Sequence, residues 1–220
     1  MRWTTVFWDL DGTLIDPWEG ITGAVRYAVA ALGHPPLDDA ALAGFIGPPL
    51  LDSFHRATGW DEARCRVAVD HYRVYFRREG IRQQHQYPGI AGLVQDLAGH
   101  GVRQVVATSK PTPFAEEIVT GHRLRPYFAE VVGSDLDGRR AAKREVLQAA
   151  VDMLGNLDLS RAVMIGDTAA DVEAAHAVGC ASVAVRYGYG HWVEIQRERP
   201  TVTVATVADL ARRLMGPGAV

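Results

Sequence analysis

The sequence predicts an α/β fold in which helices cover both faces of a parallel β-sheet, with a block of helices inserted after the first strand. Three observations support this prediction. The apolar run Thr5-Val6-Phe7-Trp8 indicates a buried strand near the start of the chain. No strand pattern follows between residues 16 and 86. From residue 88 onward, strand and helix patterns alternate, as is typical of parallel sheets.

The first strand ends in two carboxylates. Asp9 and Asp11 directly follow this strand, and residues two apart on a strand point to the same side. Gly12 then lets the chain turn away. Two like charges this close repel, and each raises the pKa of the other. A divalent cation, a shared proton, or a division of labour between a nucleophile and a proton carrier would each relieve the repulsion.

Helical periodicity begins directly after this motif. Apolar residues recur at three- and four-residue spacing, and combinations of glycine and proline at 33–36 and 47–49 interrupt the pattern. Helices are predicted over residues 18–32, 38–45, 50–58 and 61–79. The expected domains are therefore residues 1–15 with 88–220, and an inserted helical domain over residues 16–87.

The second half of the chain alternates between the two-residue period of strands and the 3.6-residue period of helices. Strands are predicted over residues 102–107, 127–132, 162–165, 182–185 and 201–204. Helices are predicted over residues 90–99, 112–120, 141–154, 169–178 and 207–215. Strand–helix–strand units place consecutive strands parallel, and ligands bind at the carboxyl ends of such strands. We therefore expect functional side chains just after the strands.

Two later strands also end in polar residues. Thr108 and Ser109 follow the strand over 102–107, and Asp167 follows the strand over 162–165, with Asp171 one helical turn further on. Each alone has an ordinary explanation, as a strand terminus or a helix cap. With Asp9 and Asp11, the two later aspartates would form a cluster of four carboxylates. A ligand set of oxygens alone favours Mg²⁺.

Two lysines compete to lie near these carboxylates. Lys143 precedes an amphipathic helix and could reach the cluster, although most lysines are simply solvated. Lys110 follows the strand that carries Thr108. We prefer Lys143, because a helix begins at Pro111 and is expected to turn Lys110 outward.

Composition excludes several classes of function. The chain has 220 residues, of which 48% are hydrophobic and 22% charged, with a net charge of −3. Neither the charge nor any apolar run indicates a nucleic-acid polymer or a membrane as partner. Cys65 and Cys180 lie far apart and lack neighbours at metal-ligand spacing, so no zinc site is predicted. A cytoplasmic location is expected, since no signal peptide precedes the first strand. The sequence does not indicate an oligomeric state.

The ordered motifs resemble those of haloacid dehalogenase superfamily phosphatases. Four segments carry the resemblance, and they span nearly the whole chain: Asp9-Leu10-Asp11-Gly12-Thr13, Thr108, Lys143, and Gly166-Asp167-Thr168 with Asp171. The resemblance implies a Rossmann-like core with an α-helical cap of the first type over residues 16–87. Phe7-Trp8 and Pro17 depart from the family pattern, but neither change removes a reactive group.

The resemblance also implies roles for these residues in a Mg²⁺-dependent hydrolysis of a phosphomonoester. Asp9 would attack phosphorus and form an aspartyl-phosphate, and Asp11 would transfer the protons. The implied metal residues are Asp9, Asp11 through its backbone carbonyl, Asp167, and Asp171 as a ligand or as a neighbour of a ligand. The implied phosphate contacts are Gly12, Thr108, Ser109 and Lys143. Asp11 favours phosphate chemistry over dehalogenation, because a halide leaves without a proton.

The expected substrate is a small phosphate ester. Residues 110–111, 134–138, 142–146 and 187–190 resemble the branch of phosphoglycolate phosphatases and 5′-nucleotidases. The cap candidates for substrate selection are Gly47, Pro48, Arg56 and Arg73. Two alternatives stay open: a phosphomutase of the same superfamily, and a non-catalytic phosphate-binding module. Asp11 argues against the second, since a binding module has no use for a proton carrier.

Overall fold

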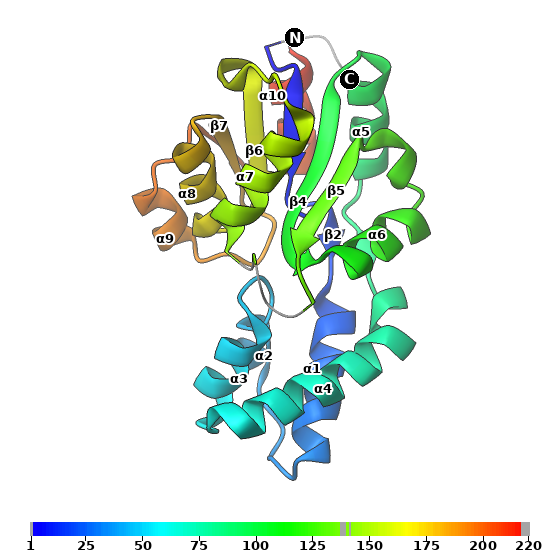
Figure 1. Ribbon diagram of the computed structural model, residues 1–220, viewed down its shortest axis with the longest axis vertical. Helices are drawn as coiled ribbons and strands as arrows, with labels where there is room; N and C mark the ends of the chain where they lie inside the picture. The colour runs from blue at the N-terminus through cyan, green and yellow to red at the C-terminus, as the bar shows by residue number, and fades with distance from the viewer. Residues whose placement is uncertain (1, 137–139, 141, 217–220) are drawn as a thin grey trace. The chain divides into compact units, whose positions relative to one another are not determined.

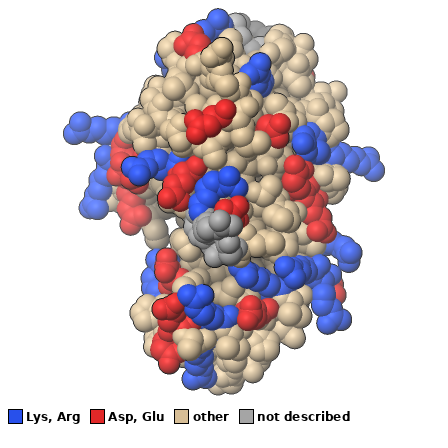
Figure 2. All heavy atoms as spheres, in the orientation of Figure 1, with Lys and Arg blue, Asp and Glu red and all other residues tan. Residues whose placement is uncertain are grey.

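The computed structural model describes residues 2–136, 140 and 142–216. The chain divides into two compact units, one formed by Met1–Asp16 with Gln86–Val220 and the other by Pro17–His85. None of the described helices combines the length and the apolarity that a bilayer-spanning segment requires. On the face drawn in Figure 2, basic and acidic side chains are interspersed.

A six-stranded parallel sheet forms the centre of the first unit, which confirms the predicted α/β fold (Figure 1). Its strands are β1 (Thr5–Trp8), β4 (Arg103–Pro111), β5 (Glu130–Ser134), β6 (Ala162–Gly166), β7 (Ala181–Val185) and β8 (Val202–Val204). The strand order is β5-β4-β1-β6-β7-β8, so β1 lies between β4 and β6. All four residues of β1 are buried. The carboxyl end of β1 therefore lies in the middle of the edge where ligands bind.

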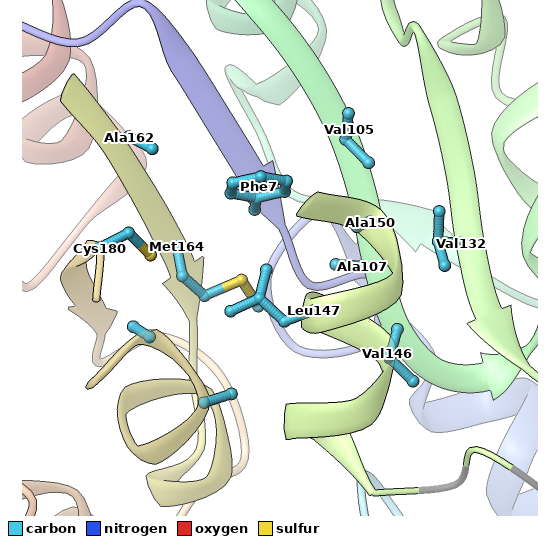
Figure 3. Close-up of a cluster of buried hydrophobic side chains, with 12 residues drawn as sticks. Phe7, Val105, Ala107, Val132, Val146, Leu147, Ala150, Ala162, Met164 and Cys180 are labelled. Carbon is cyan, nitrogen blue, oxygen red and sulfur yellow. The ribbon is translucent and has the colours of Figure 1, made fainter. Parts of the chain in front are cut away.

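Helices α7 (Lys143–Leu154) and α8 (Ala169–Val178) pack on one face of this sheet. Figure 3 shows Val146 and Leu147 of α7 among side chains from the strands, including Phe7 and Met164. Twelve buried residues belong to this cluster, and Phe7, Leu147 and Met164 are fully inaccessible to solvent. The first turn of α7 is thereby fixed against the centre of the sheet.

The opposite face packs against α5 (Ile90–Gly99) and α6 (Thr112–Gly121). A buried hydrogen-bond chain links this face to α5: Trp8 Nε1 donates to Gln104 Oε1 at 3.1 Å, and Gln104 Nε2 donates to the Val94 carbonyl at 2.8 Å. The buried polar groups of Trp8 and Gln104 are thus paired, as burial requires.

The unit also contains α9 (Trp192–Arg197) and α10 (Val207–Met215), and α10 contacts α5 and β8.

Several boundaries differ from the sequence prediction. The strand predicted from residue 127 begins at Glu130, because Pro126 lies in a 3₁₀ turn, η2 (Arg125–Tyr127). A second 3₁₀ turn, η3 (Leu159–Arg161), precedes β6. Two short strands, β2 (Ile15–Asp16) and β3 (His85–Gln86), lie where the chain passes between the units, a region predicted to lack strands. The predicted helix start at Ala141 lies outside the described residues, and α7 begins at Lys143.

The helical unit contains α1 (Trp18–Ala31), α2 (Asp39–Ala43), α3 (Leu50–Thr58), α4 (Glu62–Arg78) and the 3₁₀ turn η1 (Gly80–Arg82). Asp38 and Asp61 cap α2 and α4 by accepting hydrogen bonds from backbone N–H groups. Helix α1 packs against α4 and η1. Gly20 of α1 lies so close to η1 that a Cβ atom there would be 2.1 Å from the Gly80 carbonyl oxygen. This approach requires glycine at position 20.

We predict that Gly20→Ala destabilises the helical unit. The added methyl must displace backbone, which costs about 1–3 kcal/mol, although alanine is otherwise the better helix former. Chemical denaturation should show this loss. Gly92→Ala in α5 is the control, because a Cβ at Gly92 meets nothing within 4 Å and should stabilise by about 0.5–1 kcal/mol. Equal effects of the two substitutions would contradict the close packing of α1 against η1.

Candidate active site

Asp9 lies at the carboxyl end of the central strand. Its backbone N–H donates to the Ile165 carbonyl at 2.8 Å, which continues the pairing of β1 with β6. Its Oδ1 accepts the Leu10 N–H at 2.7 Å. The chain then turns at Gly12, which has a φ of +79°. A hydrogen bond of 2.8 Å from the Gly12 N–H to the Ile15 carbonyl closes the turn. The fold thus fixes one oxygen of the Asp9 carboxylate.

Lys143 lies at the first position of α7, and its side chain is only 5% exposed. Its ammonium group is 2.6 Å from Asp9 Oδ1 and 2.8 Å from Asp171 Oδ1. It also donates to the Ala107 carbonyl at 3.3 Å. The ammonium therefore bridges two buried carboxylates, one directly after β1 and the other in the first turn of α8.

Asp167 follows β6, and only one of its two carboxylate oxygens accepts hydrogen bonds from the described residues. Its Oδ2 accepts the N–H groups of Tyr189 at 2.7 Å and Gly190 at 3.3 Å. Its Oδ1 is buried and has no hydrogen-bond partner among the described residues. A Cβ at Gly12 would lie 2.2 Å from Asp167 Oδ2. Glycine at position 12 therefore leaves room for this carboxylate beside the first motif.

Asp171 links α8 to the same cluster. It forms a capping box with Thr168, whose N–H and hydroxyl donate to Asp171 Oδ2 at 3.0 and 2.7 Å. Its other oxygen pairs with Lys143. A Cβ at Gly166 would lie 2.1 Å from the Asp171 carboxyl carbon, so only glycine fits there. Asp171 therefore both caps α8 and orients the Lys143 ammonium.

The site fits a magnesium ion by the chemistry of its ligands. One carboxylate oxygen each from Asp9, Asp167 and Asp171 lies within 4.8 Å of the others. All three side chains are buried, and oxygen ligands of this kind are those that Mg²⁺ prefers. The unpartnered Asp167 Oδ1 is a further sign, because a buried carboxylate oxygen without a hydrogen bond requires a cation or a proton.

Burial shifts the titration of this cluster. Burial raises the pKa of Asp9 to about 6, although Lys143 opposes the shift. The pKa of Asp167 is raised to about 8, first by burial and then by the charges of Asp9 and Asp171. Burial lowers the pKa of Lys143, but the carboxylates of Asp171 and Asp9 outweigh it, and the net shift is upward. The lysine thus stays charged, while Asp167 keeps its proton near neutral pH without a cation.

The expectation that Lys110 points outward is wrong. Its side chain is 7% exposed, and its ammonium lies 2.5 Å from Asp11 Oδ2. The cause is an irregularity in β4, which extends past Ala107 to Pro111. Between Ala107 and Pro111 the pairing with β5 shifts register, and such bulges redirect side chains. Each motif aspartate of the first strand therefore has its own lysine: Lys143 beside Asp9, and Lys110 beside Asp11.

Thr108 and Ser109 lie in the same irregular part of β4. Thr108 is buried, and its hydroxyl oxygen accepts the Lys110 N–H at 3.2 Å. The Ser109 carbonyl accepts a hydrogen bond from the Ser134 hydroxyl at 2.8 Å. A Cβ at Gly133 would lie 2.2 Å from the Lys110 carbonyl oxygen, so glycine on β5 accommodates the bulge. The hydroxyl of Thr108 thereby helps to shape the backbone that carries Lys110.

The cap candidates lie in the helical unit. Gly47 and Pro48 form part of an exposed turn between α2 and α3, and Gly47 has a φ of +101°. Arg56 lies on α3 and donates to the Ser53 hydroxyl at 3.3 Å, and Arg73 is half-buried on α4. Their part in substrate selection stays a prediction. Of the segment 134–138 that resembles the nucleotidase branch, Asp137 and Gly138 lie outside the described residues.

Sequence reasoning missed the residues that hold Asp167. In the sequence, Tyr187-Gly188-Tyr189-Gly190 indicates only a resemblance to a family branch, yet two of its backbone N–H groups bind this carboxylate. Two glycines directly after a predicted strand were the available signal, because a strand end that needs glycine often marks close approach of the backbone to another group.

Comparison with known proteins places this geometry in a family. The family description "Haloacid dehalogenase-like hydrolase" matches residues 6–185. A 5′-nucleotidase of Pseudomonas aeruginosa is 42% identical over 97% of this chain and 96% of its own length. The tyrosine-protein kinase PtkA of Mycobacterium tuberculosis is 35% identical over 96% of this chain and 72% of its own length.

A phosphoglycolate phosphatase of Pectobacterium atrosepticum is 29% identical over 92% of this chain and 88% of its own length. A predicted phosphatase from Clostridium acetobutylicum, known from its crystal structure, superposes with a TM-score of 0.90 at 38% identity, covering 97% of this chain and 98% of that chain. The resemblance to haloacid dehalogenase superfamily phosphatases is confirmed, and the chain belongs to the haloacid dehalogenase-like hydrolases.

Proposed function

We propose that the chain hydrolyses small phosphomonoesters with Mg²⁺ through an aspartyl-phosphate on Asp9. The observation that carries the proposal is the buried cluster in which Lys143 anchors Asp9 Oδ1 while Asp167 lies beside it. Oδ1 also accepts the Leu10 N–H, whereas Oδ2 accepts no hydrogen bond from any residue in the described part of the chain. We therefore assign the attack on phosphorus to Oδ2 of Asp9.

In the first step, Asp9 Oδ2 forms a bond to phosphorus while the bond from phosphorus to the ester oxygen breaks. Asp11 donates a proton to that oxygen, which leaves as an alcohol. Lys110 holds Asp11 Oδ2 at 2.5 Å, and Asp11 Oδ1 has no hydrogen-bond partner among the described residues. The Lys110 contact thus supports Oδ1 as the oxygen that exchanges protons.

In the second step, Asp11 takes a proton from water, and the water oxygen attacks phosphorus. The bond to Asp9 Oδ2 breaks, which releases inorganic phosphate and restores the carboxylate. The Lys143 ammonium, the Thr108 hydroxyl and backbone N–H groups near Gly12 and Ser109 are the proposed contacts of the phosphoryl oxygens. Donors fixed in this way favour the charge that develops during transfer.

Asp9, the backbone carbonyl of Asp11, and Asp167 would hold the ion. When bound, Mg²⁺ supplies positive charge beside the transferring phosphoryl group and offsets the repulsion among the carboxylates. Asp171 would stand next to the ligands rather than bind the ion directly, because both of its oxygens are already engaged by Thr168 and Lys143. Direct ligation by Asp171 would require its contact with Lys143 to loosen.

We further propose that the helical unit, Pro17–His85, acts as the cap that selects the substrate. Nucleoside 5′-monophosphates are the favoured class, since the 5′-nucleotidase relative matches at 42% identity and the phosphoglycolate phosphatase at 29%. Arg56 and Arg73 are the candidates for binding the carboxylate of phosphoglycolate, whereas a nucleoside 5′-monophosphate has no second anionic group and would instead require an apolar or aromatic slot for its base. A cytoplasmic location remains a prediction from the sequence.

Asp9→Asn should lower kcat for 4-nitrophenyl phosphate at least about a thousandfold, because an amide cannot act as the nucleophile. Steady-state assays with MgCl2 would measure the loss. Asp96→Asn removes an exposed carboxylate of α5 and serves as the control, with full activity expected. Wild-type turnover by homogeneous Asp9→Asn protein would remove Asp9 as the nucleophile.

A panel of natural esters tests the substrate class. We expect the highest kcat/KM for a nucleoside 5′-monophosphate, a lower value for phosphoglycolate, and no isomerisation of sugar phosphates. A higher kcat/KM for phosphoglycolate would overturn the nucleotide assignment. Product with the phosphate moved to a second hydroxyl would instead establish a phosphomutase. Mg²⁺ binding without turnover of any ester would establish a non-catalytic module.

The raised pKa values predict how stability depends on pH without metal. Folded Asp167 keeps a proton up to about pH 8, whereas in the unfolded chain the carboxyl group loses it near the ordinary aspartate pKa of 3.8. The folded state therefore binds more protons than the unfolded state over this range, and stability falls as pH rises. Asp167→Asn removes this penalty. In EDTA, its free energy of unfolding relative to wild type should increase by more than about 1 kcal/mol between pH 5.5 and 8.

With MgCl2 at pH 8, the wild type should have the higher free energy of unfolding of the two proteins. The reason is that the ion stabilises the charged carboxylates of the wild type and not the Asp167→Asn variant. A difference between the two proteins that stays constant with pH in EDTA would contradict the burial of an ionisable Asp167.

A further inference from the structure

The loop after β7 is built around Asp167. Residues Tyr187, Gly188, Tyr189 and Gly190 form bends without a strand ladder. The N–H groups of Tyr189 and Gly190 donate to Asp167 Oδ2. A Cβ at Gly188 would lie 2.3 Å from Asp167 Oδ2, and one at Gly190 would lie 1.9 Å from the Asp167 carbonyl oxygen. The close approach of this loop to Asp167 therefore requires both glycines.

This requirement has a physical consequence. Glycine populates more backbone conformations than any other residue, so a loop with two glycines loses much conformational freedom when it is fixed. Two backbone N–H groups can hold a carboxylate in one place only if the loop that carries them is itself held. The loop therefore needs anchors other than its contacts with Asp167.

The tyrosine side chains supply such anchors. The Tyr189 hydroxyl donates to Asp16 Oδ1 at 2.5 Å, and the Tyr187 hydroxyl donates to the Thr13 carbonyl at 3.0 Å. The ring of Tyr87 lies 4.7 Å from that of Tyr187, measured between centroids. Thr13 and Asp16 belong to the segment that continues from the Asp9–Asp11 motif. The anchors thus tie the loop at Asp167 to the segment that follows the proposed nucleophile.

The Tyr189 contact is the stronger of the two hydroxyl anchors. A hydrogen bond to a carboxylate is shorter and stronger than one to a neutral carbonyl, and the contact of Tyr189 with Asp16 is of this kind. Tyr189 also carries the backbone N–H that lies 2.7 Å from Asp167 Oδ2. One residue thus joins Asp16 through its side chain to Asp167 through its backbone.

We propose that Tyr189 and Asp16 are a positioning pair that holds Asp167 for binding Mg²⁺. In this role the pair acts through the loop rather than by binding the substrate or the reacting atoms. The inference rests on the proposed Mg²⁺ site of the phosphatase. Loss of the Tyr189 hydroxyl should leave the protein folded but let the loop move. The hydrogen bonds from the loop N–H groups to Asp167 Oδ2 would then hold that carboxylate less firmly. Partners one layer outside a ligand commonly change metal affinity in this way.

The test is a calorimetric titration of the whole protein with MgCl2, with no substrate present. Tyr189→Phe removes one oxygen atom and should raise the dissociation constant for Mg²⁺ about three- to tenfold. Asp16→Asn removes the charge of the same contact and should weaken binding similarly. The double variant should weaken Mg²⁺ binding by less than the two single effects combined, because the two substitutions share the contact between Tyr189 and Asp16.

Tyr127→Phe is the matched control. It removes a phenol oxygen from η2, which precedes the amino end of β5 and so lies at the sheet edge opposite Asp167. It should leave the Mg²⁺ dissociation constant unchanged. Thermal unfolding in EDTA separates positioning from stability, since a purely structural role for Tyr189 would lower the melting temperature and leave Mg²⁺ affinity intact. That result, or additive weakening in the double variant, would overturn the proposal.

The wild-type measurements keep the two proposals distinct. If the wild type binds Mg²⁺ and hydrolyses 4-nitrophenyl phosphate while Tyr189→Phe binds Mg²⁺ equally well, only the positioning pair is overturned. If the wild type binds no Mg²⁺, the proposed magnesium site fails and the positioning role fails with it. If Tyr189→Phe does not fold, Asp16→Asn decides the question, and unchanged Mg²⁺ affinity of that variant overturns the pair.

Discussion

The Lys143 ammonium, 2.6 Å from Asp9 and 2.8 Å from Asp171, is the interaction on which the site depends. Without this charge, two buried carboxylates would face each other beside a third, Asp167. Removing one partner of a buried ion pair commonly costs about 3–5 kcal/mol, because the remaining charges stay buried. The contact also fixes one oxygen of Asp9 and so leaves the other to react. The two ion pairs of Lys143 thereby support both the local structure and the proposed chemistry.

The fold brings this lysine and these carboxylates together by packing and by close backbone approach. Asp9 and Asp167 follow adjacent parallel strands, β1 and β6. Lys143 begins a helix whose apolar residues pack on Phe7 and Met164, so the core sets the position of the ammonium (Figure 3). Glycines at 12, 166, 188 and 190 leave space that any other residue would fill. The acidic site is thus held by surrounding backbone as well as by charge.

Sequence reasoning could predict the parts of the site that depend on periodicity and strand ends. The apolar run before Asp9 and the strand before Asp167 predict a parallel sheet with these residues at one edge, and the sheet has that form. The orientation of Lys110 could not be predicted, because it depends on a bulge that becomes visible only when β4 pairs with β5. The bond from Tyr189 to Asp16 joins residues 173 positions apart, and no local pattern indicates it. The predicted start of β5, at Tyr127, lies too early, because tyrosine is common in strands but this one ends the 3₁₀ turn at Arg125–Tyr127.

Asp9 is proposed to carry the phosphoryl group between two separate transfers, and trapping that group on Asp9 tests this role. Because 4-nitrophenolate leaves without a proton, Asp11→Asn should allow the first transfer and slow the second, which needs a base. After rapid quenching, peptide mass spectrometry should find one phosphoryl group on Asp9 in Asp11→Asn and none in Asp9→Asn. Release of nitrophenolate with no adduct on Asp9, or with the adduct on another residue, would contradict the account.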